Sequence, residues 1–222
     1  MRRFEFPVDL PHAKAVNQTL ADVRRLRWSA VVVGLLCAAG TVGLVLLGQT
    51  WSYIVAAVLA VAALTSLWVA LWAPRKVGTI EQLYHDSPLV PAIVAATRAR
   101  GLTLLALVDI AKPDTQGRHF ALVTRKMEAI PGHRAVIGER VPCVAVLSDR
   151  TTRNDSGMWQ MVGPMPIAWG TRDRKVIADA AAQIPEAEWR VLKEQVKKVD
   201  EIDATTDRRL ELDSKDLPPE LR

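Results

Sequence analysis

A continuous stretch without a charged side chain or a histidine, from residue 28 to residue 74, constrains this chain more than any other feature. It contains two apolar runs, 28–47 and 52–73, and each reaches the roughly 20 residues that a helix needs to cross a bilayer. A short polar turn that begins at Gly48 separates them. Since a helix satisfies its own backbone hydrogen bonds in lipid, the pattern predicts a two-span transmembrane hairpin over 28–73.

Basic residues next to the two runs predict the orientation of the hairpin. Arg24, Arg25 and Arg27 precede the first run, Arg75 and Lys76 follow the second, and the connecting turn carries no charge. Basic residues that flank a transmembrane helix stay on the cytoplasmic side. We therefore expect a protein of the cytoplasmic membrane with both termini in the cytoplasm. A cleaved signal peptide fits poorly, because a second apolar run follows at once.

Small residues recur at four-residue spacing inside the runs, as in Gly34 with Ala38 and Ala39 with Gly43. This spacing lets helix backbones approach closely. We favour packing of the two spans against each other, and a homo-oligomer is the alternative. Neither span holds an ionisable group, which argues against an ion or proton path.

The remaining chain predicts an α+β domain. After a cytoplasmic segment, 1–27, and the hairpin, we expect a helical connector over 74–101, with one helix capped by Thr79 and a second that starts at Ser87-Pro88 and ends at Gly101. Apolar runs bounded by turn residues predict strands over 102–110, 119–127, 136–147 and 158–168. Short strands joined by turns favour a small, mostly antiparallel sheet or a partial barrel.

Helices are expected to flank this sheet. Thr171 is a candidate cap for a helix over 172–183, and Pro185 opens another in which Trp189 and Val196 lie on the apolar face. The domain is therefore expected over 102–203. From residue 204 the chain is polar and acidic, which predicts a disordered tail over 204–222.

No catalytic, metal or cofactor constellation stands out. The two cysteines, Cys37 and Cys143, fall in different parts of the chain, and a zinc site needs three or four converging ligands. We therefore predict no cofactor and no metal. An enzyme would need scattered groups such as His119, His133, Glu139 and Cys143 to converge in a pocket.

Basic residues gather in the first half of the domain. The candidate face for anionic lipid consists of Arg118, Arg125, Lys126, Arg134 and Arg140. For a domain tethered to the inner leaflet, anionic headgroups are the nearest partners, and an ordinary solvated surface is the alternative. Nucleic acid is not expected, because these charges lack aromatic platforms on which bases could stack.

An apolar cluster near two prolines contains Trp159, Met165 and Trp169. It is either part of the core, which we favour, or an exposed docking patch for a partner protein, since Trp and Met are enriched at interfaces.

Two segments carry a resemblance to a known family. Residues 135–147, with Gly138-Glu139-Arg140-Val141-Pro142-Cys143, and residues 164–171, with Pro164-Met165-Pro166-Ile167-Ala168-Trp169-Gly170-Thr171, resemble an uncharacterised family of actinobacterial two-span membrane proteins. The resemblance covers most of residues 75–200. It implies a cytoplasmic domain after a membrane hairpin and brings no known activity.

Together these features favour a membrane-anchored accessory or scaffold protein that presents a cytoplasmic interaction domain to a membrane or cytoplasmic protein partner. The alternative is an enzyme or lipid-binding module that acts on a membrane-associated substrate.

Overall fold

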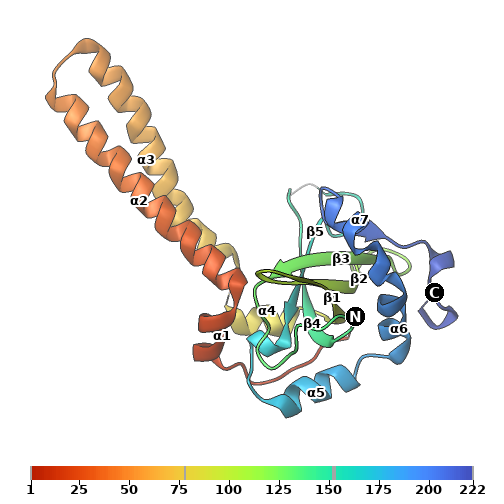
Figure 1. Ribbon diagram of the computed structural model, residues 1–222. Coiled ribbons are helices and arrows are strands. Elements are labelled where there is room, and N and C mark those ends of the chain that lie inside the picture. Colours follow the sequence, from red (N-terminus) through yellow and green to blue (C-terminus); the bar gives the residue numbers. More distant parts are fainter. Residues whose placement is uncertain (1, 78, 152–153, 222) are drawn as a thin grey trace. The chain divides into compact units, whose positions relative to one another are not determined.

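The computed structural model describes residues 2–77, 79–151 and 154–221, which form two compact units (Figure 1). The first unit combines Met1–Val16 with Ile80–Arg222, and the second is Asn17–Thr79. The chain therefore leaves the first unit, forms the second, and returns to the first.

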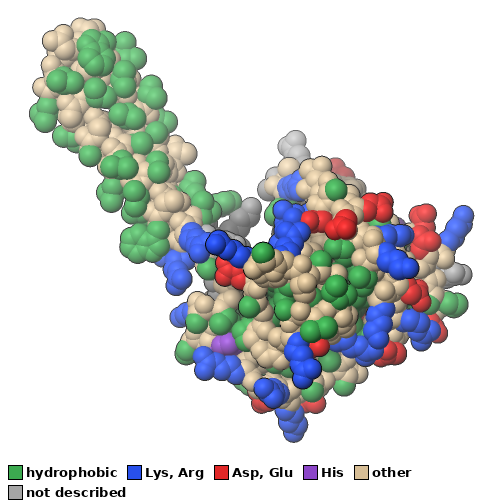
Figure 2. Space-filling view, in the orientation of Figure 1, with side chains coloured by type: hydrophobic (Ala, Val, Ile, Leu, Met, Phe, Trp, Pro, Cys, Tyr) green, Lys and Arg blue, Asp and Glu red, His purple; other side chains and the backbone are tan. Residues whose placement is uncertain are grey.

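The second unit is a helical hairpin. Its helices are α2 (Gln18–Leu46) and α3 (Thr50–Val77), and Gly48 has a φ of 67° in the turn between them. Both are long and apolar enough to cross a membrane, over Arg24–Leu46 and Thr50–Trp72, and only 6% and 17% of these spans are buried. Figure 2 shows apolar side chains covering the hairpin surface, so the protein has two candidate transmembrane helices.

Small residues form the seam between α2 and α3. Ala56, Ala63 and Ala70 are buried at seven-residue spacing, and the Cα of Gly34 lies so close to Leu67 that an added Cβ would come within 3.0 Å of its side chain. Gly34 thus packs against the other span as expected, whereas Ala39 and Gly43, the second pair named above, are exposed and lie outside the seam.

The first unit is built on one antiparallel sheet of six strands in the order β5-β4-β1-β2-β3-β6. The strands are β1 (Leu89–Arg98), β2 (Gly101–Asp109), β3 (Phe120–Met127), β4 (Arg140–Ser148), β5 (Met161–Pro166) and β6 (Arg209–Glu211). The sheet curves into a half-barrel, which brings β3 close to β5 although three strands separate them: Arg125 of β3 donates from Nη1 to the carbonyl of Pro164 in β5 at 2.9 Å. The predicted α+β class and partial barrel are confirmed.

Strand β1 corrects the sequence prediction of a helix that starts at Ser87-Pro88. The segment is a central strand that is buried from Leu89 to Ala95. Pro91 is tolerated there because it lies opposite Pro142 of β4 and before the first residue that pairs with β2, Ala92. The missing N–H of Pro91 therefore removes no bond from the β1–β2 ladder.

Helices cover the sheet, with α6 (Glu186–Gln195) against β1 and β2 and α5 (Arg174–Ala182) against β4. Helix α5 begins two residues later than predicted, because Asp173 rather than Thr171 caps it by accepting from the amide of Lys175. The short helices are α4 (Ile80–Asp86), η1 (Ile167–Trp169), η2 (Val196–Lys198) and α7 (Val199–Ala204). The predicted helix after Pro185 is thus confirmed, and it divides into α6, η2 and α7.

The prediction of a disordered tail is wrong for the described residues up to 221. Strand β6 pairs with β3, and two short turns, η3 (Ser214–Asp216) and η4 (Pro219–Leu221), follow it. Leu217 and Leu221 are each only 4% exposed. These leucines bury apolar surface, which outweighs the polar composition of the segment.

An N-terminal arm, residues 2–16, is part of the first unit and contains α1 (Leu10–Val16). Its backbone bonds to the domain at two places: the carbonyl of Arg2 accepts from Leu89, and Asp9 donates to Gly170. His12 is 3% exposed, and its Nε2 lies 3.0 Å from the carbonyl of Ala168. The segment before the hairpin is therefore packed onto the domain that follows the hairpin.

Candidate functional site: a charged pocket beside the N-terminal arm

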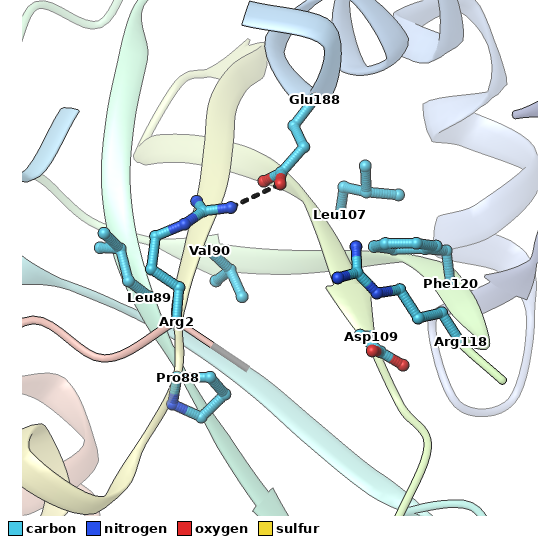
Figure 3. Close-up of a pocket in the computed structure, with 9 residues that line it drawn as sticks. All are labelled: Arg2, Pro88, Leu89, Val90, Leu107, Asp109, Arg118, Phe120 and Glu188. Atoms are coloured by element: carbon cyan, nitrogen blue, oxygen red, sulfur yellow. Dashed lines mark hydrogen bonds and ion pairs between the residues drawn. The ribbon is translucent and has the colours of Figure 1, made fainter. Parts of the chain in front are cut away.

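A pocket of about 290 Å³ lies where the arm meets the sheet and α6 (Figure 3). Its floor is apolar and its walls carry two arginines and two carboxylates. The lining residues are Arg2, Pro88, Leu89, Val90, Leu107, Asp109, Arg118, Phe120 and Glu188.

An ion pair between the arm and α6 forms one wall of the pocket. Arg2 Nη2 donates to Glu188 Oε1 at 2.6 Å, and the Glu188 side chain is only 9% exposed. The amide of Leu89 holds the Arg2 backbone in place, and Glu188 projects from the first turn of α6. Such a charge-assisted bond is stronger than a neutral hydrogen bond, so it ties the arm to the domain.

The opposite wall comes from the end of β2 and the turn that follows it. Asp109 Oδ1 accepts from the amides of Ala111 and His119, both at 3.1 Å, which fixes the turn. Arg118 is exposed, and Figure 3 shows its guanidinium next to the Phe120 ring. Within the described residues Arg118 makes no ion pair, so its donors remain available to a ligand.

The chemistry of this pocket suits binding. Its described lining offers guanidinium and carboxylate groups over an apolar floor, without a thiol, hydroxyl or imidazole side chain. Both carboxylates are already engaged, Glu188 by the Arg2 guanidinium and Asp109 by two backbone amides. We therefore treat the pocket as a place where Arg118 can engage a carboxylate or another anionic group.

The candidate catalytic residues do not converge. Cys143 is 0% exposed inside β4, and burial raises the pKa of its thiol, so no accessible thiolate is offered. His119 is exposed on the β2–β3 turn. His133 and Glu139 do meet, at 3.5 Å, and burial lowers the pKa of His133. Among the described residues no group of three or more potential metal ligands occurs.

The five basic residues of the predicted lipid face are dispersed. Arg118 lies at the pocket, and Arg125 points into the half-barrel with its guanidinium 5.3 Å from the Trp169 ring. Lys126 pairs with Asp203 at 2.7 Å and holds the pKa of that carboxyl low. Arg140 pairs with Glu186 and stacks on Trp189. Arg134 is exposed in the β3–β4 loop. These residues do not form one continuous surface, and lipid binding by them remains a prediction.

The predicted apolar cluster of Trp159, Met165 and Trp169 also does not form a single surface. Met165 and Trp169 are 0% exposed and belong to the core. Trp159 is half-buried, with the Lys112 ammonium 5.3 Å from its ring centre. Met165 and Trp169 therefore cannot be part of an exposed docking patch, because the half-barrel closes over them.

Sequence reasoning identified Arg118 but missed Arg2, Asp109 and Glu188. These residues come from the arm, the end of β2 and the start of α6. No local motif connects positions so distant in the sequence; packing of α6 on the sheet brings Asp109 and Glu188 together, and docking of the arm adds Arg2.

An α+β half-barrel following a pair of candidate membrane spans defines the class of this protein. The chain belongs to the family described as "Protein of unknown function (DUF3239)", whose model matches residues 75–200. This match begins after the second candidate span, so it agrees with the range of the resemblance noted above and leaves the actinobacterial origin a prediction.

One solved structure supports the membrane assignment. It is described as a "putative membrane protein from Corynebacterium diphtheriae", with 38% sequence identity and a TM-score of 0.52, and the similarity covers 56% of this chain and 99% of the other. No curated protein matches the chain.

Proposed function

We propose that this protein is a membrane-anchored accessory protein. Its hairpin fixes the first unit at the cytoplasmic face of the membrane, and the unit presents the charged pocket to a membrane or cytoplasmic protein partner.

The observation that carries this proposal is the N-terminal arm. The arm precedes the hairpin and yet bonds to the domain that follows it, through Arg2, Asp9 and His12. A chain that enters and leaves a hairpin from one folded unit has both hairpin ends in one compartment. A chain that crosses the membrane twice returns to the compartment from which it started, whereas a chain that crosses once does not. The docked arm therefore supports an anchor of two transmembrane helices.

The flanking charges favour the cytoplasm as that compartment. Arg24, Arg25 and Arg27 are exposed at the start of the first span, and Arg75 and Lys76 follow the second span in the sequence. The turn at Gly48 carries no charge. Under the positive-inside rule the turn is outside and the first unit is inside.

The pocket supports a binding role. Arg118 is exposed and has no ion pair among the described residues, whereas Arg2 and Glu188 neutralise each other. An acidic side chain of a partner protein could pair with Arg118 above the apolar floor formed by Leu107 and Val90. Arginine in such surroundings is a frequent binding hot spot.

Affinity purification of the full chain from a mild detergent extract tests this proposal. We expect one partner protein to copurify in a fixed ratio with the wild type. Arg118→Glu should lose this partner, whereas Arg190→Glu, which reverses an exposed charge on α6 outside the pocket lining, should retain it. Repeated recovery of the wild-type protein alone would contradict an accessory role.

A further inference from the structure

The loop between β3 and β4 exposes two adjacent aliphatic side chains. Val136 is 57% exposed and Ile137 is 58% exposed. Among the described residues of the first unit, the remaining large hydrophobic side chain with comparable exposure is Met161, at 48%. Isolated apolar residues on a surface are ordinary, but here two of the three are neighbours on one loop.

This loop, residues 131–138, has a fixed shape. Gly132 and Gly138 have φ values of 77° and 88°, which place the two bends. The backbone of Gly138 donates to Val94 at 2.8 Å, and Val94 donates to Glu139 at 3.0 Å, so β1 anchors the end of the loop. The exposed pair is therefore presented by a held backbone, and contact with another surface would require little ordering.

The available charge on the loop is positive. Arg134 is exposed and makes no ion pair within the described part of the chain. The Glu139 carboxylate that follows the loop is 33% exposed and is turned toward the buried His133 side chain at 3.5 Å, and Arg140 is paired with Glu186. An aliphatic pair with a neighbouring arginine matches the interface of an anionic bilayer, where apolar groups enter the acyl boundary and cations meet the headgroups.

The chain just before this loop contacts η1, the element on which the N-terminal arm packs. Trp169 of η1 donates from Nε1 to the carbonyl of Ala129 at 3.5 Å. Helix α1 packs on η1 and ends at Val16, the last residue of the first unit before Asn17. The hairpin tethers the first unit to the bilayer and so raises the local concentration of lipid around the loop. A small apolar contact is then sufficient for the loop to bind the bilayer.

We infer that Val136 and Ile137 insert into the headgroup layer of the bilayer that the hairpin crosses, with Arg134 bound to anionic lipid. This contact is separate from the charged pocket and fixes the orientation of the domain on the membrane. It is a lipid contact of the β3–β4 loop alone, in place of the dispersed basic face expected from the sequence.

The test places the full chain in nanodiscs that hold one copy, made of either anionic or neutral lipid. An environment-sensitive fluorophore is attached at Ile137→Cys or, as the matched exposed control, at Met161→Cys, with Cys37 replaced by Ala; Cys143 is fully buried and does not react. We expect a blue-shifted emission at position 137, quenched by spin-labelled acyl chains in anionic discs. Position 161 should show neither change.

Reversal of the loop charge supplies a second readout. Arg134→Glu should shift the inserted-to-free ratio at position 137 by roughly fivefold or more in anionic discs and should leave it unchanged in neutral discs. The inference is overturned if acyl-chain quenching is absent at position 137 or equal at positions 137 and 161. It is also overturned if the spectral change occurs only in discs with two copies, because a second chain then covers the loop.

Discussion

The contact of His12 with the domain gives a quantitative test of how firmly the N-terminal arm is docked. The His12 Nε2 lies 3.0 Å from the carbonyl of Ala168, and Arg172 Nε donates to His12 Nδ1 at 3.0 Å. The Nδ1 nitrogen therefore accepts, and Nε2 carries the proton that it donates to Ala168. The ring is buried at 3% exposure, so its bond to Ala168 is shielded from water, whereas the bond from the exposed Arg172 is only partly buried.

Removal of this ring in His12→Ala should free the arm. Each hydrogen bond contributes about 1 kcal/mol net, so the variant should lose roughly 2 kcal/mol of docking free energy. That loss corresponds to an approximately 30-fold larger population of the undocked arm.

A buried thiol in the arm would report this population. Ala13 is 0% exposed, so a cysteine placed there by Ala13→Cys reacts with a thiol reagent only when the arm opens. We expect His12→Ala to raise its labelling rate about 30-fold. Lys14→Ala, at an exposed neighbour, should leave the rate nearly unchanged. Equal rates for His12→Ala and the parent would refute the reasoning.

Three further predictions concern the first unit and are checked by thermal or urea unfolding of the full chain in detergent. Gly101→Ala should lower the free energy of unfolding by roughly 3 kcal/mol or more, because φ is 100° and an added Cβ would lie 2.1 Å from a backbone atom. The control Gly117→Ala, where φ is 86° and the surrounding space is open, should lower it by only about 1–2 kcal/mol. The ion pair with Lys126 keeps the pKa of Asp203 below its usual 3.8, so it stabilises the fold above about pH 4 and this contribution is lost as pH falls further. Asp203→Asn should lower stability at pH 7 and flatten that acid dependence, and an unchanged acid profile would disprove the assignment. Burial lowers the pKa of His133 below 6.5, so the unfolded chain binds a proton that the folded chain does not; stability should fall as pH drops below 6.5, and His133→Leu should remove this slope.

The hairpin and much of the sheet were predictable from the sequence because their signals are local. A charge-free run of sufficient length predicts membrane helices directly. The segments of β2 and β3 are apolar runs that lie between clear turn sequences. Their predicted bounds agree with the observed strands to within one residue at each end. Strand β5, which contains Pro164 and Pro166, is an edge strand, where proline is tolerated.

Strand β1 was missed because two local signals conflicted. Ser87-Pro88 has the form of a helix start, whereas Leu89 to Ala95 is an apolar run that only a strand covered on both faces explains. A short buried run cannot be assigned to helix or strand from periodicity alone. The pairing with β2 and β4, which the sequence does not display, decides for the strand.

The pocket was not predictable because it depends on packing of α6 and the arm on the sheet. Arg118 was selected for its charge, but its neighbours Arg2 and Glu188 are separated by most of the chain and meet only in the folded unit. Conversely, Arg125 resembled a surface cation in the sequence, but it lies inside the half-barrel against Trp169. The composition of a segment does not report which way a strand residue points.

The most direct measurement of the central claim is the side of the membrane on which each part of the chain lies. Single cysteines at Gln49, in the hairpin turn, and at Glu220, in the described tail, would be exposed to a membrane-impermeant maleimide on intact cells. The account predicts that position 49 is labelled from outside and that position 220 is labelled only after the membrane is opened. Labelling of position 220 on intact cells, or protection of position 49 under both conditions, would contradict it.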